Sequence, residues 1–292
     1  MTNNVHIGNP VIDELRLCYI GEPQLLDELT KVEVGCYVYF GDFFLIRGTS
    51  DRYEFYYSVY GEVEANVIEL GEIKFGRYGS YPDSRYVYYR INNPCLYSKE
   101  LLKFALDFPI AIGLFLNNIT SLDIAIDYQK NVSSIIKRML RDERITTILN
   151  GKVIKERTKT IPEIMIDYST SLNRLKCPTI TIKQAKATKN KRRGVSIQSY
   201  DKKAEIVNSS NKKYILDYYG SPRYLFRLEV RLQYQELKDY LKSAAIALSE
   251  EIFFDQELLR KMYYYHLSSV LRFRKGRNVI SWDEMIECAG KV

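Results

Sequence analysis

Two short segments of this chain alternate polar and apolar residues with a period of two, at 121–127 and 227–231. This alternation is typical of β-strands, because successive side chains of a strand point to opposite faces of its sheet. The polar residues of each segment therefore share one face: Asp123 and Asp127 on the first strand, and Arg227, Glu229 and Arg231 on the second. Carboxylates flanked by Leu, Ile and Val are costly to bury unless a cation neutralises them.

Two kinds of cation explain this pattern. A divalent ion that grips a scissile phosphate needs two or three oxygen ligands, which neighbouring strands supply from one face. Asp123, Asp127 and Glu229 are the candidate ligands. Because the chain has only two histidines, these oxygen donors favour Mg or Mn. Alternatively, Arg227 and Arg231 pair with the carboxylates in a structural salt-bridge ladder. The spacing alone favours neither.

The remaining pattern predicts an α+β fold with a mainly antiparallel central sheet, flanking helices and a helical C-terminal tail. We expect a β-rich region over 1–234, with the candidate site at 119–232, and a helical region over 235–292. No Pro, Gly or Ser linker separates the first hundred residues from the rest. The expected strands are 34–46, 53–63, 67–75, 85–92, 119–128, 164–168, 178–182, 195–200 and 224–232. The expected helices run from Ser98 to about 108 and over 133–142, 236–251 and 256–271.

Composition limits the class of protein. Hydrophobic residues make up 46% of the chain and aromatic residues 13%, which argues against disorder. The five cysteines form no CxxC pair, so they indicate neither a zinc site nor a disulfide framework. No apolar run is long enough to span a membrane, and no basic flank precedes an apolar run at the N-terminus. We therefore expect a cytoplasmic protein that does not contact a membrane.

The net charge of +7 is concentrated in one segment. Between 183 and 203, the only acidic residue is Asp201, and the basic residues are Lys183, Lys186, Lys189, Lys191, Arg192, Arg193, Lys202 and Lys203. This density suits a phosphate backbone, and its position between two carboxylate-bearing strands favours DNA binding over a solvated loop. Arg227 and Arg231 are further candidates for DNA contact. A second basic cluster, at 272–277, suits duplex recognition or a dimer contact, or is a solvated helix end.

Three segments together resemble the Rep_trans-type rolling-circle replication initiators of small plasmids and phages, which are HUH-like endonucleases. Their signatures run RxDxAxD, then YxGSRxS…YDK, then RxE. Leu122-Asp-Ile-Ala-Ile-Asp127 matches the first signature, with Leu122 in place of the common arginine. Ser199-Tyr-Asp-Lys202 matches the end of the second, and Arg227-Leu-Glu229 matches the third. The resemblance covers roughly 115–235.

The resemblance implies a nucleophilic tyrosine in a TxYxG segment ahead of YDK. The corresponding stretch here is Thr179-Ile-Thr-Ile-Lys183, which places Thr181 at the tyrosine position. A threonine hydroxyl is a poor substitute for a phenol. Three interpretations remain open: another tyrosine attacks, with Tyr200 and then Tyr168 nearest in sequence; the nucleophile has been substituted; or the chain is a DNA-binding relative that has lost nicking.

If the site is active, the resemblance implies that Lys202 holds the phosphate or assists the nucleophile, and that a divalent ion lies on the three carboxylates. It also implies single-stranded or hairpin origin DNA as the target. A second copy of the chain and a host helicase are candidate partners. The competing hypotheses are a metal-dependent nicking and joining initiator and a catalytically silent origin or operator binder. A more remote third is a structural protein with an incidental basic loop.

Overall fold

The computed structural model describes residues 7–77, 85–154, 164–167, 178–184 and 194–288. The chain divides into two compact units, each built from segments that are distant in sequence. The tyrosine-rich unit comprises Ile12–Leu122 and Leu241–Phe254, and the site unit comprises Met1–Val11, Asp123–Tyr240 and Asp255–Val292. No helix within the described ranges has both the length and the apolar character needed to cross a membrane.

The tyrosine-rich unit is an antiparallel sheet in which most strands follow one another as a meander. Its strands are most of β1 (Pro10–Gly21), then β2 (Tyr37–Phe40), β3 (Phe43–Gly48), β4 (Tyr53–Val63), β5 (Asn66–Arg77), β6 (Tyr86–Ile91) and the first part of β7 (Leu114–Tyr128). Its helices are α1 (Pro23–Thr30), η1 (Asn93–Tyr97), α2 (Lys99–Ala111) and η3 (Glu250–Phe253). The Ser98 side chain caps α2 by accepting a hydrogen bond from the Leu101 amide, as the sequence predicts.

Tyrosines of this unit alternate between its core and its surface. Tyr57 and Tyr89 are fully buried, and the Tyr89 hydroxyl donates a hydrogen bond of 3.1 Å to the Ala105 carbonyl in α2. Tyr86 and Tyr88, whose side chains point to the other face of β6, keep 37% of their surface exposed. The period of two thus divides a tyrosine-rich strand into core and surface positions.

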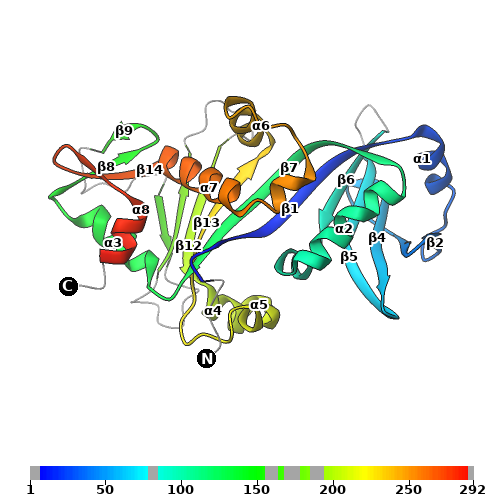
Figure 1. Ribbon diagram of the computed structural model, residues 1–292, viewed down its shortest axis with the longest axis horizontal. Coiled ribbons are helices and arrows are strands. Elements are labelled where there is room, and N and C mark those ends of the chain that lie inside the picture. The colour runs from blue at the N-terminus through cyan, green and yellow to red at the C-terminus, as the bar shows by residue number, and fades with distance from the viewer. Residues whose placement is uncertain (1–6, 78–84, 155–163, 168–177, 185–193, 289–292) are drawn as a thin grey trace. The chain divides into compact units, whose positions relative to one another are not determined.

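The site unit contains the second part of β7 and most of the remaining elements (Figure 1). Its other strands are β8 (Ile145–Leu149), β9 (Lys152–Val153), β10 (Ile164–Asp167), β11 (Thr179–Lys183), β12 (Ser196–Asp201), β13 (Phe226–Gln233), β14 (Leu271–Lys275) and β15 (Asn278–Ile280). Its helices are α3 (Val132–Arg141), α4 (Lys202–Glu205), the π-helix η2 (Ile206–Ser210), α5 (Lys213–Tyr218), α6 (Tyr234–Ser243), α7 (Gln256–Val270) and α8 (Trp282–Cys288).

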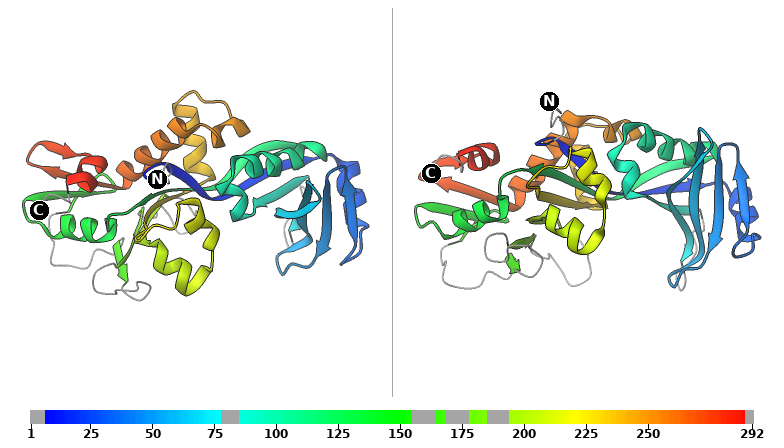
Figure 2. Two further views of the ribbon diagram at one scale, coloured as in Figure 1. Left: turned by 60° about the horizontal axis from the view of Figure 1, so that its bottom comes forward. Right: turned by 90° about the horizontal axis from the view of Figure 1, so that it is seen from below.

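Hydrogen bonds join eleven strands in the order β10-β11-β12-β13-β7-β1-β6-β5-β4-β3-β2, and a separate four-stranded sheet has the order β15-β14-β8-β9. In the site unit, one face of β11, β12 and β13 is apolar and buried, with Ile180, Ile197 and Val230 on it. The hydroxyl of Ser133 in α3 is 2.8 Å from that of Ser199 on this face, and the Tyr263 hydroxyl of α7 donates to the Leu228 carbonyl. Figure 2 shows α7 and the α4–α5 pair on opposite sides of these strands.

The predicted fold class is confirmed: the chain is α+β with a large antiparallel sheet. Several details differ from the sequence-based expectation. Strand β1 was missed because Asp13, Glu14 and Arg16 interrupt its apolar residues. The segment expected as one strand over 34–46 is a hairpin that turns at Gly41, whose φ of 62° suits glycine. The C-terminal region contains the β14–β15 hairpin between its helices.

Candidate nucleic-acid site on the polar sheet face

The second face of the sheet in the site unit carries polar side chains from four neighbouring strands. We call it the polar face. Pairing partners in adjacent antiparallel strands point to the same side, so the cross-strand register places these residues together. The polar face comprises Thr181 and Lys183 of β11, Ser196, Gln198 and Tyr200 of β12, Arg227, Glu229 and Arg231 of β13, and Asp123 and Asp127 of β7.

One row of this register relates Thr181, where the sequence resemblance would place a tyrosine, to Glu229, one of the predicted metal ligands. Thr181 pairs with Gln198, and Gln198 pairs with Glu229. Two strand spacings separate Thr181 from Glu229, which is about 10 Å between backbones. A long side chain at 181 would point across Gln198 toward Glu229, whereas the threonine is too short to reach it. Gln198 was not predicted as a site residue, although its place in the alternation of β12 could have identified it.

At one end of the polar face, a charged pair is completely buried. Arg227 Nε and Nη2 donate to the two oxygens of Asp127 at 2.8 and 2.5 Å, and neither side chain has any exposed surface. Burial, and then the negative charge of Asp127, raise the pKa of Tyr218 in α5, which places this helix over the same end. Asp127 is therefore neutralised by an arginine, and Arg227 has no surface available to DNA.

The other end of the polar face is open. Arg231 Nε lies 2.5 Å from a Glu229 oxygen and 3.4 Å from an Asp123 oxygen, so one guanidinium bridges both carboxylates. Burial lowers the pKa of Arg231. The charge of Glu229, its hydrogen bond and the charge of Asp123 outweigh burial, so the pKa is raised overall. The Arg231 side chain is 46% exposed, while Glu229 is fully buried. Arg231 thus contacts two buried carboxylates while part of its own side chain is exposed to solvent.

Tyr200 is the tyrosine nearest to these carboxylates on the polar face. Its hydroxyl donates a 3.1 Å hydrogen bond to the Glu229 oxygen Oε2. The Lys202 ammonium lies 5.7 Å from the Tyr200 ring centroid, is only 2% exposed and is 3.0 Å from a Glu205 oxygen. The N-cap of α4 is Asp201, which accepts a hydrogen bond from the Ala204 amide. Burial raises the pKa of Asp201 even though the Ala204 and Lys203 amides oppose the rise.

The donor set fits a metal ion poorly. Within the described ranges, no group of three or more His, Cys, Asp or Glu side chains is placed to hold one. Arg227 takes both oxygens of Asp127, and the Arg231 guanidinium occupies the position between Asp123 and Glu229. This geometry matches the salt-bridge alternative raised by the sequence. The Mg or Mn ion on the three carboxylates stays a prediction.

Only part of the predicted basic segment can be located. Lys183 is exposed at the end of β11, on the same face as Arg231 and two strands away from it. Lys202 and Lys203 are also described, but Lys202 is buried and Lys203 donates to the Pro222 carbonyl. Tyr168 and the basic residues in the middle of the segment lie outside the described residues; the latter are Lys186, Lys189, Lys191, Arg192 and Arg193. The accessible cations of the polar face are therefore at its open end.

Comparisons with known proteins add a single structural likeness. No model of a known protein family matches the chain, and no curated protein matches it. A solved rolling circle replication initiator protein from Geobacillus stearothermophilus is similar with a TM-score of 0.45 and 10% sequence identity. The likeness covers 92% of this chain and 89% of that one. At this TM-score it says nothing of function, which must be inferred from the residues of this chain.

Proposed function

We propose that this chain binds single-stranded DNA on its polar face, as a replication-origin binder of the kind that the three sequence motifs resemble. The observation that carries the proposal is the Arg231 guanidinium, which bridges Glu229 and Asp123 while 46% of its side chain is exposed. Its outward N–H groups suit a phosphodiester oxygen, because a planar guanidinium binds phosphate through two donors. Lys183 adds a second exposed cation on the same face.

Binding does not require an added metal ion in this proposal. Arg231 supplies the positive charge between the two carboxylates, and Arg227 supplies it at Asp127. Gln198 offers amide donors and acceptors between the strands that carry Lys183 and Arg231, and Tyr200 offers a partly exposed ring on the same strand. Polar groups and an aromatic ring beside cations suit an unpaired strand, whose bases stack and whose phosphates bind cations.

The second candidate is nicking and joining, with Tyr200 as nucleophile. The hydrogen bond from Tyr200 to Glu229 favours it, because a carboxylate that accepts the phenol proton is the arrangement a base needs. Thr181 weighs against it, since the position in register with Gln198 and Glu229 lacks a phenol. We place binding first for this reason.

The direct test is the anisotropy of a labelled single-stranded oligonucleotide and of a labelled hairpin, each titrated with protein in EDTA and then in Mg²⁺. We expect both to bind, with affinities that agree within about twofold between the two buffers and fall as salt rises. Absence of binding at low salt would contradict the proposal, and so would binding that requires Mg²⁺.

Incubation of the same oligonucleotides with Mn²⁺, followed by a denaturing gel, tests the second candidate. A covalent protein–DNA adduct that disappears in Tyr200→Phe would establish nicking, and its absence in both proteins is the result we expect. A host helicase and a second copy of the chain stay predicted partners. A pull-down tests the helicase, and the molar mass from light scattering tests the second copy.

A further inference from the structure

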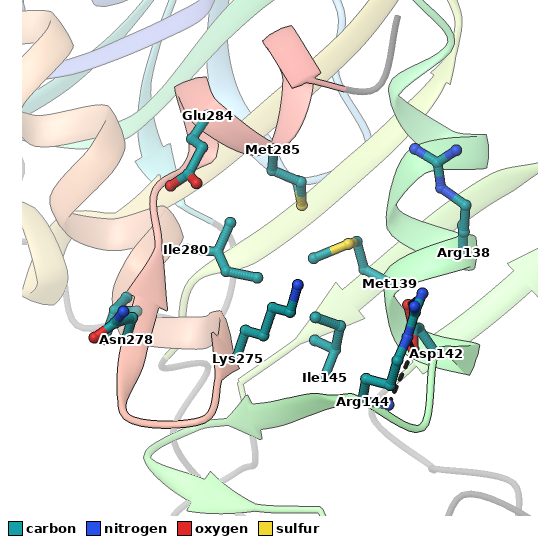
Figure 3. A pocket seen from close by; sticks show the side chains of 11 residues that line it. Arg138, Met139, Asp142, Arg144, Ile145, Lys275, Asn278, Ile280, Glu284 and Met285 are labelled. Atoms are coloured by element: carbon teal, nitrogen blue, oxygen red, sulfur yellow. Dashed lines mark hydrogen bonds and ion pairs between the residues drawn. The ribbon is translucent and has the colours of Figure 1, made fainter. Parts of the chain in front are cut away.

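A pocket of about 600 Å³ opens in the site unit, away from the polar face. It lies between the end of α3 and the start of β8 on one side and the β14–β15 hairpin and α8 on the other (Figure 3). Ligand sites typically have volumes of about 300 to 1,000 Å³. The pocket is therefore large enough for a small organic molecule and lies outside the site proposed above.

The inner wall of the pocket is apolar. It is formed by Met139, Ile145, Ile280 and Met285, which come from four different elements. Figure 3 shows these side chains converging on one space. Two methionines favour an aromatic ligand, because thioether sulfur makes favourable contacts with aromatic rings and adapts to their shape.

Basic side chains line the pocket together with this apolar wall. Arg144 is tied to Asp142 by two hydrogen bonds of 3.0 and 2.8 Å, which neutralises that carboxylate. Arg138 and Lys275 also line the pocket, and neither side chain has an ion pair with another residue in the described part of the chain. Glu284 is the remaining acidic residue in the lining. Apart from the Arg144–Asp142 pair, the lining thus contains two cations and one carboxylate, which leaves a net positive charge for an anion.

We propose that this pocket binds a nucleoside monophosphate, either free or as an unstacked nucleotide of a DNA strand. The aromatic base would lie against Met139 and Met285, and the phosphate would bind Arg138 and Lys275. An apolar wall with cations in the same lining matches both parts of such a ligand. The site goes beyond the proposed function, because it uses none of the residues of the polar face.

The chain carries its own reporter for this pocket. Trp282 is the one tryptophan in the sequence and begins α8, the helix that contributes Glu284 and Met285. Its ring is buried and packs 6.0 Å from the ring of Phe273 in β14. Because β14 and α8 both line the pocket, we expect ligand binding to change Trp282 fluorescence.

The test is to titrate the full chain separately with dAMP, dTMP and deoxyadenosine. Binding is measured by Trp282 fluorescence and by calorimetry. Saturable binding of the monophosphates, at least about fivefold tighter than that of the nucleoside, is the expected result. Lys275→Gln and Arg138→Gln should each remove most of that difference without weakening nucleoside binding. Met139→Ala should weaken the nucleoside and the monophosphates alike.

Two control variants separate this site from the polar face. Arg272→Gln removes an exposed charge from the same strand outside the pocket, and Arg231→Gln removes the cation of the polar face. Both should bind dAMP as the unaltered chain does. The proposal is overturned if no ligand binds, if nucleoside and monophosphate bind equally, or if Arg231→Gln abolishes dAMP binding. Failure of oligonucleotide binding at the polar face would leave the dAMP result unchanged.

An oligonucleotide competition identifies the source of the nucleotide. If single-stranded DNA displaces dAMP from the unaltered chain and from Arg231→Gln, the pocket accepts a nucleotide within a strand. If single-stranded DNA binds without displacing dAMP, the pocket takes free nucleotide. Both results support the proposed ligand class.

Discussion

The two ends of the polar face use the same chemistry for different purposes. Arg227 and Arg231 lie four positions apart on β13, point to the same side and each contact a carboxylate. The Arg227–Asp127 pair is fully buried beneath α5, whereas Arg231 is 46% exposed. Exposure, rather than residue type, therefore separates an ion pair that holds the fold from a cation that can bind a ligand.

Desolvation explains why this difference has consequences. Removing one partner of a buried pair leaves an uncompensated charge without water, whereas an exposed partner is replaced by solvent. At the open end, Glu229 is buried but its partner reaches the surface. A phosphate can approach Arg231 without either carboxylate leaving its place in the sheet.

The largest expected effect is at the buried end. Arg227→Ala should lower the free energy of unfolding by about 3 to 5 kcal/mol, because Asp127 would remain buried and unpaired. Denaturant unfolding followed by circular dichroism measures it. The double variant Arg227→Met, Asp127→Leu should recover most of the loss, because it removes both charges. If Arg227→Ala were as stable as the unaltered chain, the buried ion pair would not hold the fold and the proposed difference between the two ends would be wrong.

A buried histidine on α7 tests whether burial alone makes the charged form of a side chain costly in this protein. His266 is 4% exposed between the rings of Tyr240 and Tyr265, and burial lowers its pKa from 6.5 to about 4. Between pH 6.5 and 4, His266 is protonated in the unfolded chain and neutral in the folded chain. The free energy of unfolding should therefore fall as the pH is lowered through this interval. The loss at His266 is at most about 3 kcal/mol.

Unfolding in denaturant at pH 7 and pH 5 measures this dependence. His266→Gln should have a shallower loss of stability over that interval than the unaltered chain. An identical pH dependence in both proteins would mean that His266 is protonated in the folded chain, and burial alone would then not set its charge.

At the open end, we expect an effect on binding and a smaller effect on folding. Arg231→Gln should weaken single-stranded DNA binding about tenfold, as expected for the loss of a charge-assisted hydrogen bond, and lower the free energy of unfolding by about 1 to 3 kcal/mol, because the buried Glu229 loses its cation but keeps the hydrogen bond from Tyr200. Arg231→Lys keeps the charge and should retain most of the affinity. A stability loss as large as that of Arg227→Ala would make the two ends equivalent and contradict the comparison.

The smallest effect is expected at Tyr200. Tyr200→Phe removes the hydroxyl that donates to Glu229 and should lower stability by about 1 kcal/mol, because Arg231 still contacts that carboxylate. Thermal unfolding measures the change. A loss above about 3 kcal/mol would mean that Tyr200, rather than Arg231, is the main partner of Glu229.

Much of the candidate site could be predicted from the sequence. The alternation over 121–127 and 227–231 placed the acidic and basic side chains on shared faces, and antiparallel strands carry them as expected. Gln198 was missed: the alternation of β12 puts it on the same face as Tyr200, but its pairing with both Thr181 and Glu229 depends on the register of the folded sheet. The pocket was also missed, since its apolar wall combines two parts of the chain that are distant in sequence, α3 with β8 and β15 with α8.

The sequence by itself determined the α+β class, the strand faces and the residue types that meet on the polar face, because a period of two depends only on backbone geometry. Only the tertiary structure decided which cation neutralises each carboxylate and which of those cations reaches water. Both depend on strand order, register and covering helices, which arise from contacts between residues far apart in the chain. A buried and an exposed arginine four positions apart therefore look alike in sequence and differ only once the chain has folded.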